Sequence, residues 1–106
     1  MESSYSMECK DGTAKIVLTG RLDAASAPKF QEKLRELSAQ KISNLVFFAK
    51  DLEYISSAGL RVIIFAKQKL GADAKLYLIG APAAVLNVIK MSGLDNFMIV
   101  QDQYPG

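Results

Sequence analysis

The sequence predicts a single α/β domain, in which a mixed, mostly parallel sheet opens with an antiparallel hairpin and is backed by helices. Half of the 106 residues are hydrophobic, so residues 1–106 can form one domain that buries roughly two-thirds of its unfolded surface. Asp11-Gly12, the strongest kind of short hairpin signal, stands between two strand-like segments. From Leu45 onward, strand-like and helix-like segments alternate, as they do in right-handed βαβ units.

The first part of the chain predicts a hairpin followed by a helix. The two strands are expected at 5–10 and 14–19, on either side of the turn. Ser26-Ala27-Pro28 is typical of an N-cap and first helical turn, and predicts a helix over about 27–40. Apolar residues recur on one face of this helix, at Phe30, Leu34 and Leu37.

The second part predicts a central strand and then alternating elements. Residues 45–49 form an uninterrupted apolar run, the pattern of a strand that is covered on both faces. The later elements are expected to be a helix over 57–70 that stops at Gly71, a strand at 75–79, a helix over 83–91 between Pro82 and Gly93, and a short strand at 97–100. The helical side chains expected to pack on the sheet are Phe30, Leu34, Leu60, Ile63, Ile64, Val85 and Ile89.

Composition argues against several classes of function. The 13 basic and 11 acidic residues are scattered along the chain, and without a basic block we expect no direct nucleic-acid binding. The sequence has no histidine and one cysteine, so a Ser-His or Cys-His pair and a histidine or cysteine metal cluster are excluded. Neither a Walker A motif nor a Gly-x-Gly-x-x-Gly fingerprint is present. We therefore expect no enzyme activity, no catalytic residue, no cofactor and no metal.

The N-terminus and the apolar runs indicate a cytoplasmic location. The chain begins without a basic and then apolar signal segment, and its apolar runs are shorter than the ~20 residues needed to cross a bilayer. Cys9, the only cysteine, fits a reducing compartment. No membrane insertion is expected.

The most informative segment is 51–64, where the hydrophobic period changes from two to 3.6 across Ser56-Ser57. A helix is expected to begin there, and its first N–H groups lack intrahelical partners and lie at the positive end of the macrodipole. A serine at this position can cap the helix, which is worth about 0.5–2 kcal/mol. The same position would favour a phosphate.

Three segments resemble one family. Residues 51–60, DLEYISSAGL, are similar to the signature of the STAS domain, and specifically of the bacterial anti-sigma factor antagonists. Residues 19–23, TGRLD, and 91–94, MSGL, match further parts of the family pattern in the right order. The matches extend over most of the chain and imply a STAS-like fold.

The resemblance implies a site. The serine that a partner kinase phosphorylates in this family corresponds to Ser57, and Asp23 corresponds to an aspartate close to it. Ser56 is the competing acceptor, at a position where the family more often has aspartate. Gly59 is interpreted as a residue of packing or close backbone approach, whereas the exposed Arg61 is near enough in sequence to contact an acidic partner or a phosphate. The residues expected at the switch and partner contact are Asp23, Ser56, Ala58, Gly59 and Arg61.

The resemblance also implies a function, partner switching in transcription regulation. The unphosphorylated protein would bind an anti-sigma factor, a serine kinase of the GHKL type, and phosphorylation would end the complex. A PP2C-type phosphatase would reset the phosphoprotein. The alternative is a constitutive STAS scaffold subunit of a membrane-associated lipid-transport or signalling complex, in which the serine only caps a helix.

Overall fold

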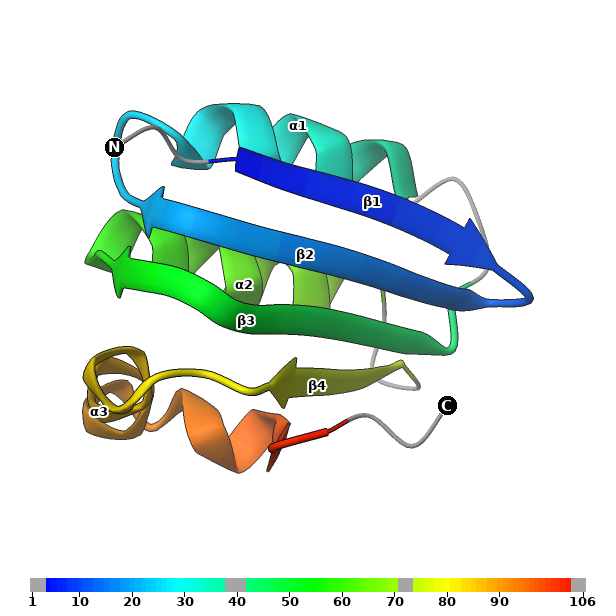
Figure 1. Ribbon diagram of the computed structural model, residues 1–106. Helices are drawn as coiled ribbons and strands as arrows, with labels where there is room; N and C mark the ends of the chain where they lie inside the picture. Colours follow the sequence, from blue (N-terminus) through cyan, green and yellow to red (C-terminus); the bar gives the residue numbers. More distant parts are fainter. Residues whose placement is uncertain (1–3, 38–41, 71–73, 104–106) are drawn as a thin grey trace.

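A computed structural model describes residues 4–37, 42–70 and 74–103 (Figure 1). Within these residues, the sheet has five strands in the order β1-β2-β3-β4-β5. The pair β1-β2 is antiparallel and the other neighbouring pairs are parallel. The strands are β1 (Ser4–Lys10), β2 (Thr13–Leu22), β3 (Asn44–Ile55), β4 (Lys75–Ile79) and β5 (Ile99–Gln101). The helices are α1 (Ala27–Leu37), α2 (Ser57–Leu70), α3 (Ala83–Ser92) and the 3₁₀ helix η1 (Leu94–Phe97).

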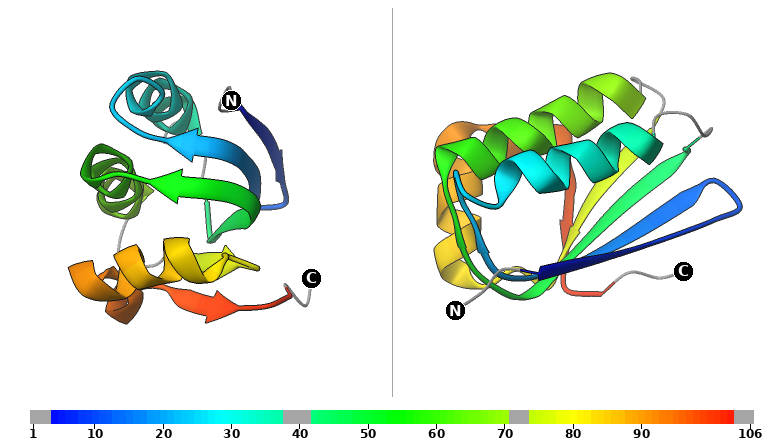
Figure 2. Two further views of the ribbon diagram at one scale, coloured as in Figure 1. Left: turned by 60° about the vertical axis from the view of Figure 1, so that its left-hand side comes forward. Right: turned by 90° about the horizontal axis from the view of Figure 1, so that it is seen from above.

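The helices α1 and α2 lie side by side on one face of the sheet, and α3 lies at the end of the sheet where β4 ends (Figures 1 and 2). Alternate residues of β2 are buried, as expected for a strand with one covered face. At the centre of the core, the rings of Phe30 in α1 and Phe47 in β3 meet edge to face, with centroids 5.9 Å apart. This contact joins the helix layer to the middle strand.

The predicted fold is confirmed in its main features. Asp11 and Gly12 both have positive φ, 52° and 80°, and Lys10 pairs with Thr13 across the two-residue turn. This is the backbone that a tight hairpin requires, and Asp and Gly tolerate it. The strand that starts at Asn44 is central, although it extends to Ile55, well beyond the apolar run that predicted it.

The prediction that Ile64 packs on the sheet is wrong. Its side chain is 40% exposed, whereas its neighbour Ile63 is 1% exposed. Successive helical residues are rotated by about 100°, and the stripe of α2 that faces the sheet is already formed by Val62, Ile63 and Ala66. Leu60 is half-buried at the edge of this stripe. Leu34, Phe30, Val85 and Ile89 are buried, as predicted.

The last strand begins later than predicted. Gly93 has the left-handed φ of 78° and ends α3, as expected of a C-cap glycine. The chain then turns through η1, because the Asn96 N–H and its side-chain amide both donate to the Gly93 carbonyl. Phe97 therefore belongs to this turn and is 64% exposed, and β5 starts at Ile99. The expected ends of the helices at Gln40 and Gly71 lie outside the described residues.

Candidate functional site

The strands β2 and β3 end side by side and bring two distant segments together. Leu22 and Ile55 are partners at the last position of the parallel ladder. The Ser56 N–H then donates to the Leu22 carbonyl at 2.9 Å. Asp23 follows Leu22 and Ser57 follows Ser56, so the loop after β2 and the start of α2 meet at the same edge of the sheet.

Gly59 allows α2 to approach the strand ends closely. A Cβ atom at this position would lie 2.6 Å from the Leu22 carbonyl oxygen and 2.9 Å from Cγ1 of Ile55. Real side chains do not tolerate such a distance to backbone, so only glycine fits this position. Gly59 is itself buried. Gly59 therefore allows α2 to pack against the ends of β2 and β3, as the packing interpretation predicts.

The adjacent serines have different environments. The Ser56 hydroxyl accepts a hydrogen bond from the Gly59 N–H at 3.3 Å, and the Ser56 carbonyl accepts the first helical bond from Leu60. Ser56 is thus the N-cap residue of α2 and is half-buried. Ser57 is the first residue of the helix and its side chain is exposed. Of the two serines, Ser57 is therefore the exposed residue at the helix N-terminus.

Asp23 closes a tight turn in front of α1. Its Oδ1 accepts hydrogen bonds from the N–H groups of Ala25 and Ser26, at 3.1 and 3.2 Å. These bonds, the one from Ser26 first, lower the pKa of the Asp23 carboxyl from its ordinary value. Ser26 precedes the first residue of α1 and its carbonyl accepts from Phe30, so it occupies the expected N-cap position. Its hydroxyl accepts from the Asp23 N–H, which ties the helix start to the turn. The carboxylate is consequently held ionised and fixed beside the start of α1.

Sequence reasoning missed a pair of side chains beside this turn. The Arg21 guanidinium lies over the Tyr54 ring at 4.5 Å from the centroid, and Arg21 Nε is 3.5 Å from Oδ2 of Asp23. Tyr54 is 42% exposed. Arg21 and Tyr54 are partners in the ladder between β2 and β3. The sequence predicts this pair only if the register of the two strands is already known.

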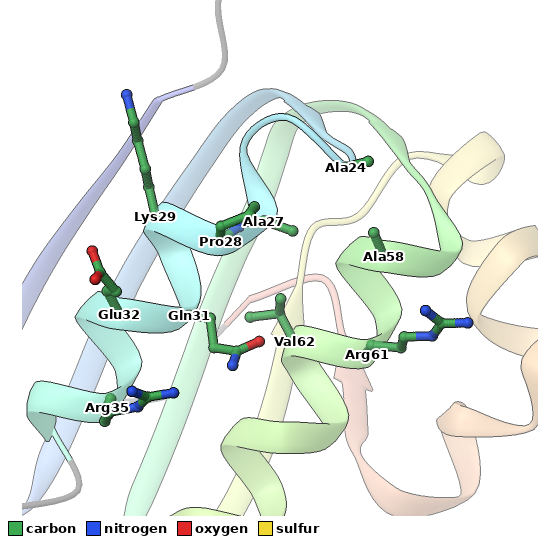
Figure 3. A pocket seen from close by; sticks show the side chains of 10 residues that line it. All are labelled: Ala24, Ala27, Pro28, Lys29, Gln31, Glu32, Arg35, Ala58, Arg61 and Val62. Carbon is green, nitrogen blue, oxygen red and sulfur yellow. The ribbon is translucent and has the colours of Figure 1, made fainter.

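Ala58 and Arg61 line a groove between the N-terminal halves of α1 and α2 (Figure 3). Figure 3 shows Gln31 of α1 and Val62 of α2 between the two helices, with Arg35 on the α1 side. The groove measures about 610 Å³, a size at which pockets hold several ligand or side-chain groups. Sequence reasoning singled out Ala58 and Arg61 but not the groove, because it depends on how the two helices pack.

The described part of the chain contains no group of three or more His, Cys, Asp or Glu residues that could hold a metal ion. Of the helices that the structure describes, none has both the length and the apolar character needed to cross a membrane. This edge of the sheet carries a helix capped by Ser56, the exposed Ser57 and the carboxylate of Asp23, which its turn holds in place.

The STAS domain family matches residues 4–104, and the chain belongs to this family. Over 85 residues it is 25% identical to the anti-sigma-F factor antagonist RsfB of Mycobacterium tuberculosis, a match that covers 80% of this chain and 70% of RsfB.

Solved structures share the fold. An anti-sigma factor antagonist from Mycobacterium paratuberculosis superposes with a TM-score of 0.85 at 22% identity, covering 96% of this chain and 87% of that one. The anti-sigma factor antagonist SpoIIAA in its unphosphorylated form has a TM-score of 0.82 at 21% identity, covering 92% and 87%. The phosphorylated form of SpoIIAA from Bacillus has a TM-score of 0.73 at 20% identity, covering 92% and 90%.

Proposed function

We propose that this protein is an anti-sigma factor antagonist that is switched by phosphorylation of Ser57. The observation that carries the proposal is that the two serines have different environments. The Ser56 hydroxyl caps α2, while Ser57, the first residue of that helix, is exposed. A kinase can reach the second without breaking the cap of the first. The names of RsfB and SpoIIAA, and the existence of SpoIIAA in both phosphorylation states, support the same proposal.

The partner in this proposal is an anti-sigma factor that is also a serine kinase of the GHKL type. The unphosphorylated protein binds it in the cytoplasm and frees a sigma factor. The kinase then transfers the γ-phosphoryl group of ATP to Oγ of Ser57. An O–P bond forms at Oγ, the bond between the γ-phosphorus and the bridging oxygen breaks to release ADP, and a base of the kinase takes the hydroxyl proton. A PP2C-type phosphatase hydrolyses the phosphoserine and resets the cycle.

The electrostatics of the site explain why phosphorylation would break a complex without unfolding the protein. A phosphate at the N-terminus of α2 is favourable to the helix itself, because the first N–H groups and the macrodipole attract negative charge. In a packed contact, the same charge of about −1.5 to −2 would be desolvated without a partner, which is costly. The ionised Asp23 at the same edge adds repulsion.

The proposed contact surface surrounds Ser57. Ser56, Ala58 and Arg61 are half-buried or exposed on the first turns of α2, and Asp23 borders them from the loop after β2. Gly59 acts indirectly, by holding the helix against the strand ends. We therefore assign partner contact to Asp23, Ser56, Ala58 and Arg61, and a positioning role to Gly59.

Intact-mass measurement after incubation with ATP and candidate GHKL serine kinases tests the proposal. The wild type and Ser56→Ala should each gain the mass of one phosphoryl group, and Ser57→Ala should gain none. Labelling of Ser57→Ala but not of Ser56→Ala would move the acceptor to Ser56. If all three proteins bind such a kinase and none is phosphorylated, the switch is rejected and the constitutive scaffold remains.

A further inference from the structure

The groove between α1 and α2 begins at Ala58, the residue that follows Ser57 (Figure 3). Small and medium apolar side chains line it, including Ala27 and Pro28 from α1 and Val62 from α2. Val62 and Ala27 are also part of the hydrophobic core, so this lining is held rigidly by the packing of the two helices. The groove thus offers an apolar floor beside the proposed phosphoacceptor.

The charges around this floor are mostly positive. Three cationic residues line the groove, Lys29, Arg35 and Arg61, against one anionic residue, Glu32. Neither α1 nor α2 has an acidic residue in its first turn. The ionised Asp23 lies at the same end, but it does not line the groove, and its Oδ2 is 3.5 Å from Nε of Arg21, which partly offsets its charge. The groove therefore attracts negative charge.

Two of the cations are placed on opposite sides of the groove. Arg35 of α1 has its guanidinium 5.8 Å from the centroid of Phe65 of α2, a contact that spans the two helices. Arg61 of α2 is exposed and lines the groove, and its guanidinium points away from α1 in Figure 3, so it borders the groove on the outer side of α2. Arginine presents several N–H donors in a planar fork that suits carboxylates.

We propose that this groove docks an acidic segment of the partner kinase, with a small apolar side chain on the floor and carboxylates near Arg61 and Arg35. This inference rests on the proposed function for the identity of the partner. It also gives the phosphate a specific target: a segment bound next to Ala58 brings negative charge beside Ser57, well within the Debye length of about 8 Å at physiological salt. The phosphate on Ser57 would then repel the docked segment, and its charge would also lose hydration in the complex.

The first test compares two charge reversals, using the kinase that phosphorylates Ser57 in the intact-mass experiment. Arg61 is exposed, so Arg61→Glu should fold. We expect it to weaken binding by about 10-fold, mainly through slower association, and to reduce the salt dependence. Lys75→Glu is the matched control, exposed at the first residue of β4 at the other end of the strands. Equal binding by both variants would overturn the proposal.

The second test does not need the kinase. A synthetic peptide of alternating Glu and Leu, and a matched peptide of Lys and Leu, are titrated into the ¹⁵N-labelled protein. The acidic peptide should shift amide signals along α1 and α2 in the wild type and in Lys75→Glu, but not in Arg61→Glu, and the basic peptide should shift none of these signals. Binding that is unchanged in Arg61→Glu, or no binding of the acidic peptide, would overturn the groove assignment.

The two proposals fail separately. Because Arg61 is also assigned to the partner contact around Ser57, Arg35→Glu separates the two proposals. If Ser57 is phosphorylated and Arg35→Glu binds the kinase as the wild type does, the switch stands and the docking groove is rejected. If no GHKL kinase phosphorylates Ser57 while the acidic peptide binds the groove, the proposed function fails, and the charge preference of the groove is supported.

Discussion

The Ser56 N–H donates a hydrogen bond to the Leu22 carbonyl at 2.9 Å, and this bond joins the start of α2 to the end of β2. The bond brings Ser57, which follows Ser56, and Asp23, which follows Leu22, to one edge of the sheet. Gly59 makes the approach possible, because any side chain there would overlap the same Leu22 carbonyl. The geometry of the proposed switch therefore depends on backbone contacts of Leu22, Ser56 and Gly59, and not on a contact between Ser57 and Asp23.

Gly59→Ala should destabilise the protein. The new methyl group would lie 2.6 Å from the Leu22 carbonyl oxygen, so α2 must move away from the strand ends. Overpacking of this kind costs about 1–3 kcal/mol, which exceeds the gain of about 0.5–1 kcal/mol from replacing glycine by alanine in a helix. Urea unfolding measures the difference in the free energy of unfolding.

Gly93→Asn is the control for this prediction. Gly93 has a left-handed backbone and its surroundings are open, since a Cβ atom added there would lie 4.0 Å from its nearest neighbour, Nδ2 of Asn96. Asparagine tolerates this backbone better than other side chains, so the loss should stay below about 1 kcal/mol. If Gly59→Ala is no more destabilising than Gly93→Asn, close packing at Gly59 is not a constraint.

Local signals in the sequence predicted most of the fold. The hairpin at Asp11-Gly12, the start of α2 at Ser57 and the end of α3 at Gly93 each depend on a few neighbouring residues, and all three are observed. Ile64 was misplaced because Ile63 and Ile64 both fit a helical apolar pattern. Only the packed structure decides which of them faces the sheet.

The site was predictable in part. The sequence predicted two serines at the N-terminus of a helix, but it did not show which one caps the helix, because adjacent serines have the same side chain. That choice depends on where the first helical turn begins. The stack of Arg21 on Tyr54 required the ladder register, and the groove beside Ala58 required the packing of two helices. These features arise from residues far apart in the chain.

Alanine at each serine should affect stability differently. Ser56→Ala removes the acceptor for the Gly59 N–H and should lower the free energy of unfolding by about 0.5–2 kcal/mol. Because the Ser57 side chain is exposed, Ser57→Ala should change it by no more than about 0.5 kcal/mol. Thermal or urea unfolding of both variants checks this order. The reverse order would assign the cap to Ser57.

Asp23 should make stability depend on pH in the acidic range. Its pKa is lower in the folded protein, so the ionised carboxylate contributes stability above its unfolded pKa of about 3.9, and this contribution is lost as the pH falls through the folded-state pKa. Asp23→Asn keeps an oxygen acceptor for the turn but removes the charge. The wild type should therefore be more stable than Asp23→Asn at pH 7, and the difference in stability should shrink as the pH falls below the unfolded pKa. A gap that stays constant on acidification would contradict this assignment.

Ser57→Asp should bind the partner kinase poorly while remaining folded. A carboxylate on the first residue of α2 stabilises the helix by about 0.3–1 kcal/mol, so the melting temperature should not fall. In the complex the same charge would lose its water next to the docked acidic segment, and unfavourable charge contacts in interfaces cost several kcal/mol, so we expect an affinity at least ~10-fold weaker. Ser57→Asn has nearly the shape of Ser57→Asp without its charge, and should bind within a few-fold of the wild type. Calorimetry with the kinase measures all three affinities. Equal weakening by Asp and Asn would show that size rather than charge disrupts the contact, and equal affinity for every variant would leave Ser57 without a role in switching.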